Sequence, residues 1–169
     1  MIEEMMSATE KESGDRAHAV RGMFDRFVTR HEVAVGDARP GADHPTASFA
    51  SVTGREEDLV AQQARLADLT VVPHPDAGED VSSSDALHAV LFDSGRPVLI
   101  SRQAAPTTIG TRVCLAWNGT AEAAASAWAA MPCMQRAEAV RILSADGYQR
   151  RGPGAPDLAA YLALHGVNA

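Results

Sequence analysis

The chain has 169 residues, of which 22 are acidic and 15 are basic, and its formal net charge is −7. It contains no basic run, which excludes the phosphate-neutralising surface of a nucleic-acid-binding protein. No stretch approaches the roughly 18 consecutive apolar residues of a membrane-spanning helix. The N-terminal residues are acidic and polar, unlike a secretory signal. We therefore expect a cytoplasmic protein that contacts neither nucleic acid nor a membrane.

The first elements expected along the chain are an amphipathic helix and an edge strand. Residues 1–15 are expected to be disordered. From residue 16 to 31, apolar residues recur at spacings of three and four, which predicts a helix with one inward face. That face comprises Ala17, Val20, Phe24, Phe27 and Val28. Turn-forming residues fill 36–45, and alternating apolar residues predict a half-exposed strand over 46–52.

Two helices and two strands are expected between residues 55 and 101. The helix over 55–67 has Leu59, Val60, Ala64 and Ala67 on its inward face. Residues 69–72 and 97–101 are short apolar runs, typical of buried strands. The helix between them has an apolar stripe of Leu87, Val90 and Leu91. Ser82 and Asp85 stand in the S-x-x-D relation of a capping box, which places the start of this helix.

A linker over 102–110 leads to the last group of elements. The apolar run over 112–117 shows no alternation, which predicts a strand buried on both faces. Asn118 and Gly119 form a turn, and Thr120 caps the helix that follows. The remaining expected elements are the helix over 120–131, with Ala124, Ala127, Trp128 and Met131 inward, a strand over 138–144 and a helix over 157–165.

Cysteine and histidine usage indicates no metal or redox chemistry. Cys114 lies within the strand over 112–117, and Cys133 follows a helix, so both are expected to be reduced thiols packed in the core. The six histidines show no H-x-x-x-H or H-x-H spacing, so we expect no metal site. No nucleophile elbow, phosphate-binding loop or dinucleotide-binding glycine motif occurs, and we expect no enzymatic activity.

The order of the elements predicts the fold class. Strands that alternate with helices indicate right-handed crossovers and a mostly parallel sheet, which is a three-layer α/β fold. A weak internal repeat is also present. The first helix ends in RHEV (30–33) and the last in LHGV (164–167), so that both place a histidine two residues before a valine.

Three segments carry a resemblance to a known family: RLADLTVVP (65–73), LFDSGRPVLIS (91–101) and RVCLAWNGTAEAA (112–124). The chain resembles the universal stress proteins, specifically the bacterial type with two such domains in tandem. This resemblance implies a mostly parallel five-stranded sheet with helices on both faces, of the adenine nucleotide alpha hydrolase type.

The matching segments occur in an unusual order. Residues 16–101 resemble the second helix through the fifth strand of a first domain, and residues 111–169 resemble the first strand through the second helix of a second one. The chain thus looks like a truncated or permuted slice that contains one copy of each of the five strands. If the family's strand order holds, the strand over 112–117 lies beside 69–72, within one chain or between two chains as a swapped dimer.

One branch of this family binds ATP through G-x2-G-x9-G-[ST]. The corresponding residues here are Pro73, Asp76, Ser84 and Asp85. Proline removes a donor and the carboxylates repel phosphate, so we expect no ATP and no other cofactor at this loop. Asn118 and Gly119 stand where the family's Asp-Gly meets the nucleoside. They are the candidate cofactor-binding residues, and a simple Asn-Gly turn is the alternative interpretation.

These observations give three functional hypotheses. The first is a non-enzymatic stress-response binding or interaction module, forming a homodimer through the strand Pro97–Ser101 or by exchange of segments. The alternative is a nucleotide-binding (ATP or AMP) stress regulator with at most weak ATPase activity. The third is an inert fragment of a tandem protein.

Overall fold

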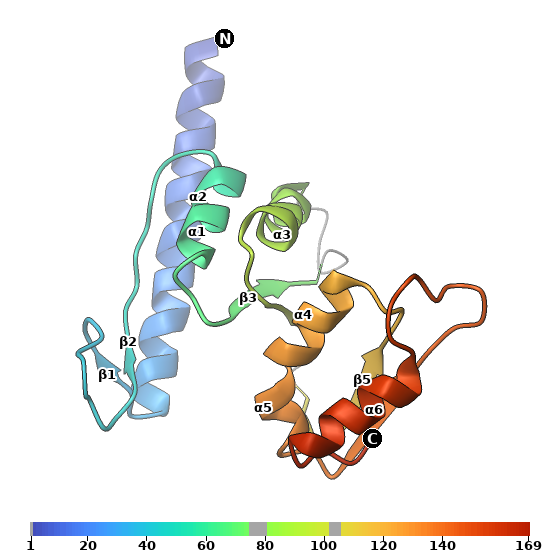
Figure 1. Cartoon of the computed structure of the whole chain (residues 1–169). Coiled ribbons are helices and arrows are strands. Elements are labelled where there is room, and N and C mark those ends of the chain that lie inside the picture. The colour runs from blue at the N-terminus through green and yellow to red at the C-terminus, as the bar shows by residue number, and fades with distance from the viewer. Residues whose placement is uncertain (1, 75–80, 102–105) are drawn as a thin grey trace. The chain divides into compact units, whose positions relative to one another are not determined.

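The computed structural model describes residues 2–74, 81–101 and 106–169. It contains helices and short parallel strands, so the mixed α/β class predicted from the sequence is confirmed. The chain divides into two compact units, Met1–Gly54 and Arg55–Ala169. Figure 1 follows the elements of each unit along the chain. Among the described helices, none combines the length and the apolar character that crossing a membrane requires.

The first unit is built on one long helix. Helix α1 extends from Ile2 to Arg30, so residues 2–15, for which we expected disorder, are helical. Two short strands follow, β1 (Ala34–Val35) and β2 (Thr46–Ala47), and they pair in parallel. The strand expected over 46–52 is therefore reduced to its first two residues, since small and polar residues dominate the segment after Ala47.

Only part of the apolar face of α1 is covered within this unit. Val28 is buried, and the ring of Phe24 lies 5.6 Å from the ring of Phe49 between centroids. Val20 and Phe27, which we expected to face inward, are 47% and 57% exposed. The helix is longer than the short segment that packs against it, so one side of its apolar face is not covered within this unit.

The second unit begins with a helix and a strand–helix–strand group. Its elements are α2 (Glu56–Ala64), β3 (Thr70–Pro73), α3 (Val81–Asp93) and β4 (Val98–Ser101). Strands β3 and β4 pair in parallel, with Val71 opposite Leu99. A buried cluster of Ala64, Val72, Leu87 and Val90 packs the two helices against one face of this pair. The inward positions of α3 are confirmed except Leu91, which is 48% exposed.

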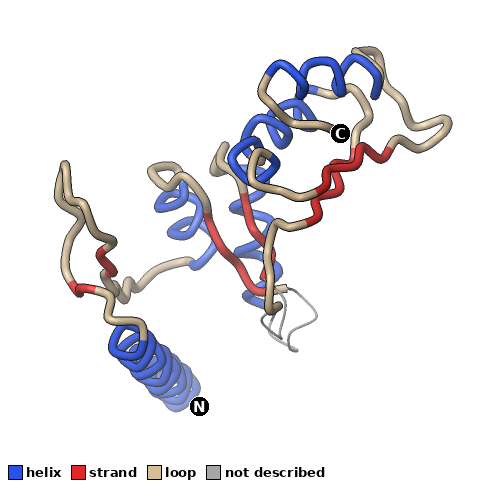
Figure 2. The backbone as a smooth tube through the Cα atoms, turned by 90° about the horizontal axis from the view of Figure 1, so that it is seen from below, coloured by secondary structure: helices blue, strands red, loops and turns tan. Residues whose placement is uncertain are grey.

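The remaining elements form a second strand–helix–strand group with a final helix. They are β5 (Arg112–Ala116), α4 (Ala121–Ala129), α5 (Met131–Met134), β6 (Ala139–Leu143) and α6 (Ala155–Leu164). Strands β5 and β6 pair in parallel along their whole length. Their core consists of Leu115, Trp117, Ala127, Met131, Met134, Val140, Leu158, Leu162 and Val167. Figure 2 shows the paired strands as neighbouring red segments of the backbone.

Strand β5 is not buried on both faces, and this prediction is wrong. Leu115 is buried and Val113 is half-buried on the face that packs against the core, whereas Cys114 between them is exposed. The same alternation occurs in β6, where Val140 is buried and Arg141 is exposed. Within this group the core lies on one face of the pair, so the apolar run in the sequence corresponds to a strand with one uncovered face.

The continuous five-stranded, three-layer sheet is not confirmed. The described strands form three separate parallel pairs, β1–β2, β3–β4 and β5–β6. The strands expected over 69–72, 97–101, 112–117 and 138–144 are all present. Within the described part of the chain, however, β5 bonds to β6 and not to β3. Among the described residues, each pair therefore has two edges without a further strand partner.

The repeated histidine–valine motif marks the same helix end twice. After α1, Glu32 has φ of 53°, and after α6, Gly166 has φ of 77°. The amide of the following valine then donates to the carbonyl five residues earlier, Val33 to Val28 at 2.9 Å and Val167 to Leu162 at 3.0 Å. Both ends are Schellman motifs, in which a left-handed residue closes the helix.

Candidate functional site

The candidate residues lie where β5 leads into α4. Trp117, the first residue after β5, is 6% exposed. Its indole N–H donates to the carbonyl of Pro153 at 2.9 Å, and its backbone N–H donates to the carbonyl of Leu143 at 2.8 Å. These two bonds fasten the end of β5 to the last residue of β6 and to the segment that follows β6. The turn after Trp117 is thereby held at the carboxyl end of the strand pair.

The turn itself is closed by its own side chains. The side-chain oxygen of Asn118 accepts a hydrogen bond from the backbone N–H of Thr120 at 3.2 Å. The hydroxyl of Thr120 accepts one from the N–H of Ala123 at 3.3 Å, so Thr120 is the N-cap of α4. The predicted turn and cap are confirmed. The side-chain oxygens of Asn118 and Thr120 thus already accept hydrogen bonds from the backbone N–H groups of Thr120 and Ala123. An anion bound at this helix end would need the same N–H groups.

The loop after β6 packs directly on Gly119. Arg150 donates its backbone N–H to the carbonyl of Asn118 at 2.8 Å. A side chain at Gly119 would collide with the amide group of Gln149 and would lie 3.2 Å from the carbonyl of Pro153. A Cβ added at Gly152 would likewise collide with the carbonyl of Gly119. The packing of two loops therefore accounts for the glycine at position 119, whose φ is +80°.

The first turn of α4 carries a negative charge. A hydrogen bond from its own backbone N–H, and then one with the hydroxyl of Thr120, hold the pKa of Glu122 below its usual range. Glu122 is therefore ionised at neutral pH. A carboxylate in the first turn is favourable for the helix, because it complements the positive end of the helix dipole. It also disfavours a phosphate group at the same place.

The residues at the positions of the ATP-binding loop are divided between β3 and α3. Pro73 is the last residue of β3. Asp76 lies outside the described residues. Helix α3 begins at Val81, so Ser82 lies inside the helix and does not mark its start, which corrects the prediction from Ser82 and Asp85. The side chain of Ser82 lies outside the described part of the structure, so the capping box itself stays a prediction.

The structure offers no assembled metal site in the residues that it describes. Their histidine, cysteine, aspartate and glutamate side chains do not gather in groups of three or more. Cys114 and Cys133 are both exposed, which corrects the prediction that they are core thiols. Cys114 is exposed because it falls on the uncovered face of β5, and Cys133 lies in the short helix α5.

Exposed apolar side chains on the strands are the feature that the sequence patterns missed. Val71 and Leu99 lie opposite each other on β3 and β4 and are 58% and 42% exposed. We call these two residues the outer face of β3–β4. The opposite face carries Val72, which is 5% exposed and packs against the helices. Both faces of each strand are apolar in the sequence, so periodicity gave no signal to separate them.

A second exposed apolar group lies on α4 and α6. Trp128, which we expected to face inward, is 61% exposed, and its ring meets that of His165 edge-on at 5.8 Å. Ala124 is exposed as well. The ring of Tyr161 lies 4.7 Å from the same histidine. Because α4 is rich in alanine, the sequence permits several inward faces, and the helix uses the one that contains Ala127.

Comparison of the chain with protein-family models, with curated proteins and with solved structures gave no match.

Proposed function

We propose that the chain is a non-enzymatic protein-interaction module of the universal stress type. The observation that carries this proposal is the outer face of β3–β4, where Val71 and Leu99 stay exposed although parallel strands are ordinarily covered on both faces. Ile100, which pairs with Val72 on the other face of β3–β4, is 42% exposed as well. Uncovered apolar side chains on strands with open edges are typical of surfaces that bind another polypeptide.

The strand pairs also suggest how such an association is built. We propose that β3–β4 and β5–β6 are parts of one sheet, in which the free edge of β5 lies beside the free edge of β3. Isolated two-stranded pairs are only marginally stable, so joining them adds hydrogen bonds that neither pair makes alone. The contact forms within one chain or, in a swapped homodimer, between two, and the strand Val98–Ser101 at the other edge is a further association surface.

Two local features of the structure support the proposed resemblance to universal stress proteins. The strand over 112–116 is followed by the Asn-Gly turn and a capped helix, as the resemblance implies. The two Schellman helix ends after α1 and α6 fit the interpretation that they are equivalent helices of two related domains.

The nucleotide-binding alternative is less well supported. Asn118 and Thr120 bond the amides at the start of α4, and the ionised Glu122 follows them. The loop over 149–153 occupies the space next to Gly119. A nucleotide at Asn118 and Gly119 would have to displace these contacts, and this favours the interaction function.

The proposal is tested by changing the outer face of β3–β4 in the full-length chain. Leu99→Lys places a charge on this face and is expected to weaken self-association in sedimentation experiments by about tenfold or more. Gln62→Lys, at an exposed position of α2, makes the same charge change on a polar surface and should leave association unchanged. Equal behaviour of the two variants would contradict the proposal.

Differential scanning fluorimetry tests the nucleotide alternative. A ligand that binds the native state raises the unfolding temperature by mass action. We expect no shift with millimolar Mg-ATP or with AMP. An increase of a few degrees, abolished by Gly119→Val, would instead establish the nucleotide-binding function.

A further inference from the structure

Asn118 and Gly119 place an electrophile and a nucleophile in neighbouring residues. The electrophile is the side-chain carbonyl carbon Cγ of Asn118, and the nucleophile is the backbone nitrogen of Gly119. Attack on the side chain of an asparagine is least hindered when the next residue is glycine, because glycine has no side chain of its own. Asn118 is half-buried, so water reaches it. The turn is therefore a candidate for a covalent change that needs no enzyme.

The change is a deamidation through a cyclic intermediate. A bond forms between the nitrogen of Gly119 and Cγ of Asn118 and closes a succinimide ring, while the side-chain nitrogen leaves as ammonia with the proton that the backbone nitrogen loses. Water then adds to one of the ring carbonyls and opens the ring. Opening at Cγ gives aspartate at position 118, and opening at the backbone carbonyl gives isoaspartate. Asparagine and water are thereby converted to aspartate or isoaspartate and ammonia.

The hydrogen bonds of the native turn oppose the closure of this ring. The ring contains the Cα–C bond of Asn118, and closing it requires a rotation about that bond away from the ordinary helical and extended conformations. The rotation would move the carbonyl of Asn118, which accepts a hydrogen bond from the backbone N–H of Arg150 at 2.8 Å. It would also take the side-chain oxygen of Asn118 away from the N–H of Thr120, which it binds at 3.2 Å.

The loop over 149–153 makes further contacts that hold the turn in place. The carbonyl of Pro153 accepts a hydrogen bond from the indole N–H of Trp117 at 2.9 Å. Gly152 lies so close to Gly119 that an added Cβ would collide with the Gly119 carbonyl. The turn therefore keeps its native conformation for as long as this loop remains attached to it.

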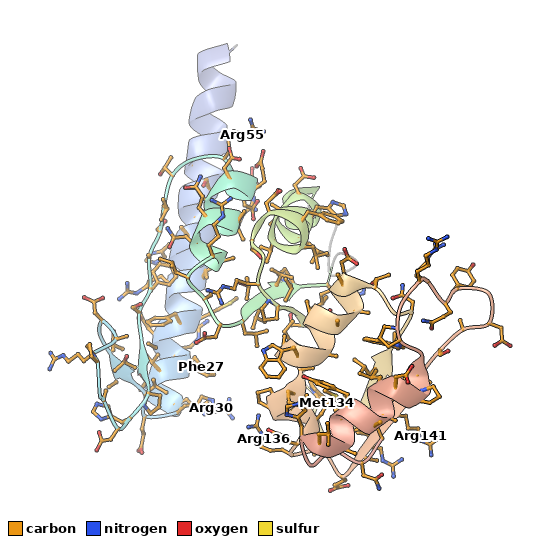
Figure 3. The ribbon with its side chains drawn as sticks, viewed as in Figure 1. Phe27, Arg30, Arg55, Met134, Arg136 and Arg141 are labelled. Carbon is orange, nitrogen blue, oxygen red and sulfur yellow. The ribbon has the colours of Figure 1, made fainter. Side chains whose placement is uncertain are left out.

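The loop is exposed, whereas the core beneath its group is not. Every residue from 144 to 153 is exposed, and Figure 1 shows this segment as an orange-red loop between β6 and α6. Met134, labelled in Figure 3, belongs to the core of the same group and is 2% exposed. A segment with few buried contacts opens at a lower free-energy cost than the core. The loop therefore detaches in chains whose core remains folded.

We propose that Asn118 is a site of spontaneous deamidation and that the loop over 149–153 protects it. The attached loop prevents ring closure, and local opening of the loop permits it. Isoaspartate adds one carbon atom to the main chain at position 118, so Gly119 and Gly152 cannot regain their close packing. The change is irreversible and marks chains in which the loop has opened. This proposal goes beyond the interaction function, since it does not involve the outer face of β3–β4.

A second sequence of the same kind provides an internal reference. Asp146 and Gly147 lie in an exposed turn, closed by a hydrogen bond from the N–H of Tyr148 to the carbonyl of Ala145 at 3.1 Å. Among the described residues, no atom lies within 4 Å of a Cβ added at Gly147. Aspartate followed by glycine forms the same succinimide with loss of water. Because this turn is already exposed, its reaction should change little when residues 149–153 detach.

Peptide mapping of the full-length chain by mass spectrometry tests the protection. Deamidation replaces an amide nitrogen by an oxygen, which changes the mass of the peptide, and an isoaspartate-specific methyltransferase detects the rearranged product. At neutral pH, we expect Asn118 to react at least about tenfold more slowly in the native chain than in the same chain unfolded in guanidinium chloride. Equal rates in the native and the unfolded chain would overturn the proposal.

Gly152→Ala tests the role of the loop. The added methyl group collides with the carbonyl of Gly119, so the variant should detach the loop and raise the rate at Asn118, relative to the rate at Asp146, by about tenfold. Gly154→Ala is the matched control, because the nearest atom to its methyl group among the described residues is 3.5 Å away. This control should react at the wild-type rate.

Circular dichroism measures the unfolded fraction of each variant under the conditions of the assay. The unfolded fraction gives the rate that global unfolding alone would produce, and the rate at Asn118 in Gly152→Ala should exceed it. A rate no faster than that of Gly154→Ala, or one that the unfolded fraction explains in full, would overturn the protective role of the loop.

Discussion

Glu32 occupies a backbone conformation that ordinarily belongs to glycine. Its φ of 53° lies in the left-handed region, and it closes α1 through the bond from Val33 to Val28. Gly166 has the corresponding place after α6, with φ of 77°. A side chain in this region loses of the order of 1 kcal/mol relative to glycine. The first helix end therefore stores strain that the second one avoids.

Glu32→Gly is expected to stabilise the chain by about 0.5–1 kcal/mol, because it removes this strain while keeping the Schellman bonds. The matched change Gly166→Ala should destabilise by about 1 kcal/mol for the opposite reason. Urea denaturation followed by circular dichroism measures both. Loss of stability in Glu32→Gly would show that the Glu32 side chain contributes more than its backbone strain costs.

Gly119 combines a left-handed backbone with close packing. Gly119→Ala is expected to destabilise by about 2–3 kcal/mol, because the new methyl group meets both Gln149 and the carbonyl of Pro153. Gly147 is a suitable control, since its φ of 78° is similar but no atom lies within 4 Å of an added Cβ. Gly147→Ala should cost only about 1 kcal/mol.

Chemical denaturation of the two alanine variants separates packing from backbone strain. An equal loss of stability in both would mean that the contact between Gly119 and the loop over 149–153 contributes little. A larger loss at Gly119 supports the interpretation that loop packing, rather than a ligand, requires the glycine there.

At the scale of the elements, the sequence predicted the strands and helices well where local chemistry specifies them. The turn at Asn118 and Gly119, the cap at Thr120 and the parallel strands on either side of α4 all follow from short-range patterns. These features depend on neighbouring residues, so one sequence contains the information that they need.

The sequence did not predict which face of a strand or helix is buried, because that depends on what packs against the element. The run that includes Cys114 is apolar throughout, so nothing in it shows which side remains uncovered. Helix α4 is alanine-rich, and its buried residue Ala127 and its exposed residue Trp128 are both apolar. Val20 and Phe27 of α1 were predicted inward for the same reason, and both are exposed. Local pattern fixes the apolar positions, but tertiary packing selects the buried ones.

At the scale of the whole molecule, the second unit contains two separate buried clusters. One is centred on Val90, in the group with β3 and β4, and the other on Leu162, in the group with β5 and β6. Both side chains are 0% exposed. If the strand pairs are joined in one sheet, as we propose, a substitution that destabilises one cluster should also destabilise the other. If the pairs remain apart, each cluster should lose stability alone.

Leu162→Ala tests this coupling. The change removes a fully buried side chain and is expected to destabilise the β5–β6 group by about 2–4 kcal/mol. With a joined sheet, hydrogen exchange should become faster at the amides of β5 and β6 and also at those of β3. Leu164→Ala, on the same helix but at an 84% exposed position, should change neither. Faster exchange confined to β5 and β6 would show that the two strand pairs are independent and would contradict the joined sheet.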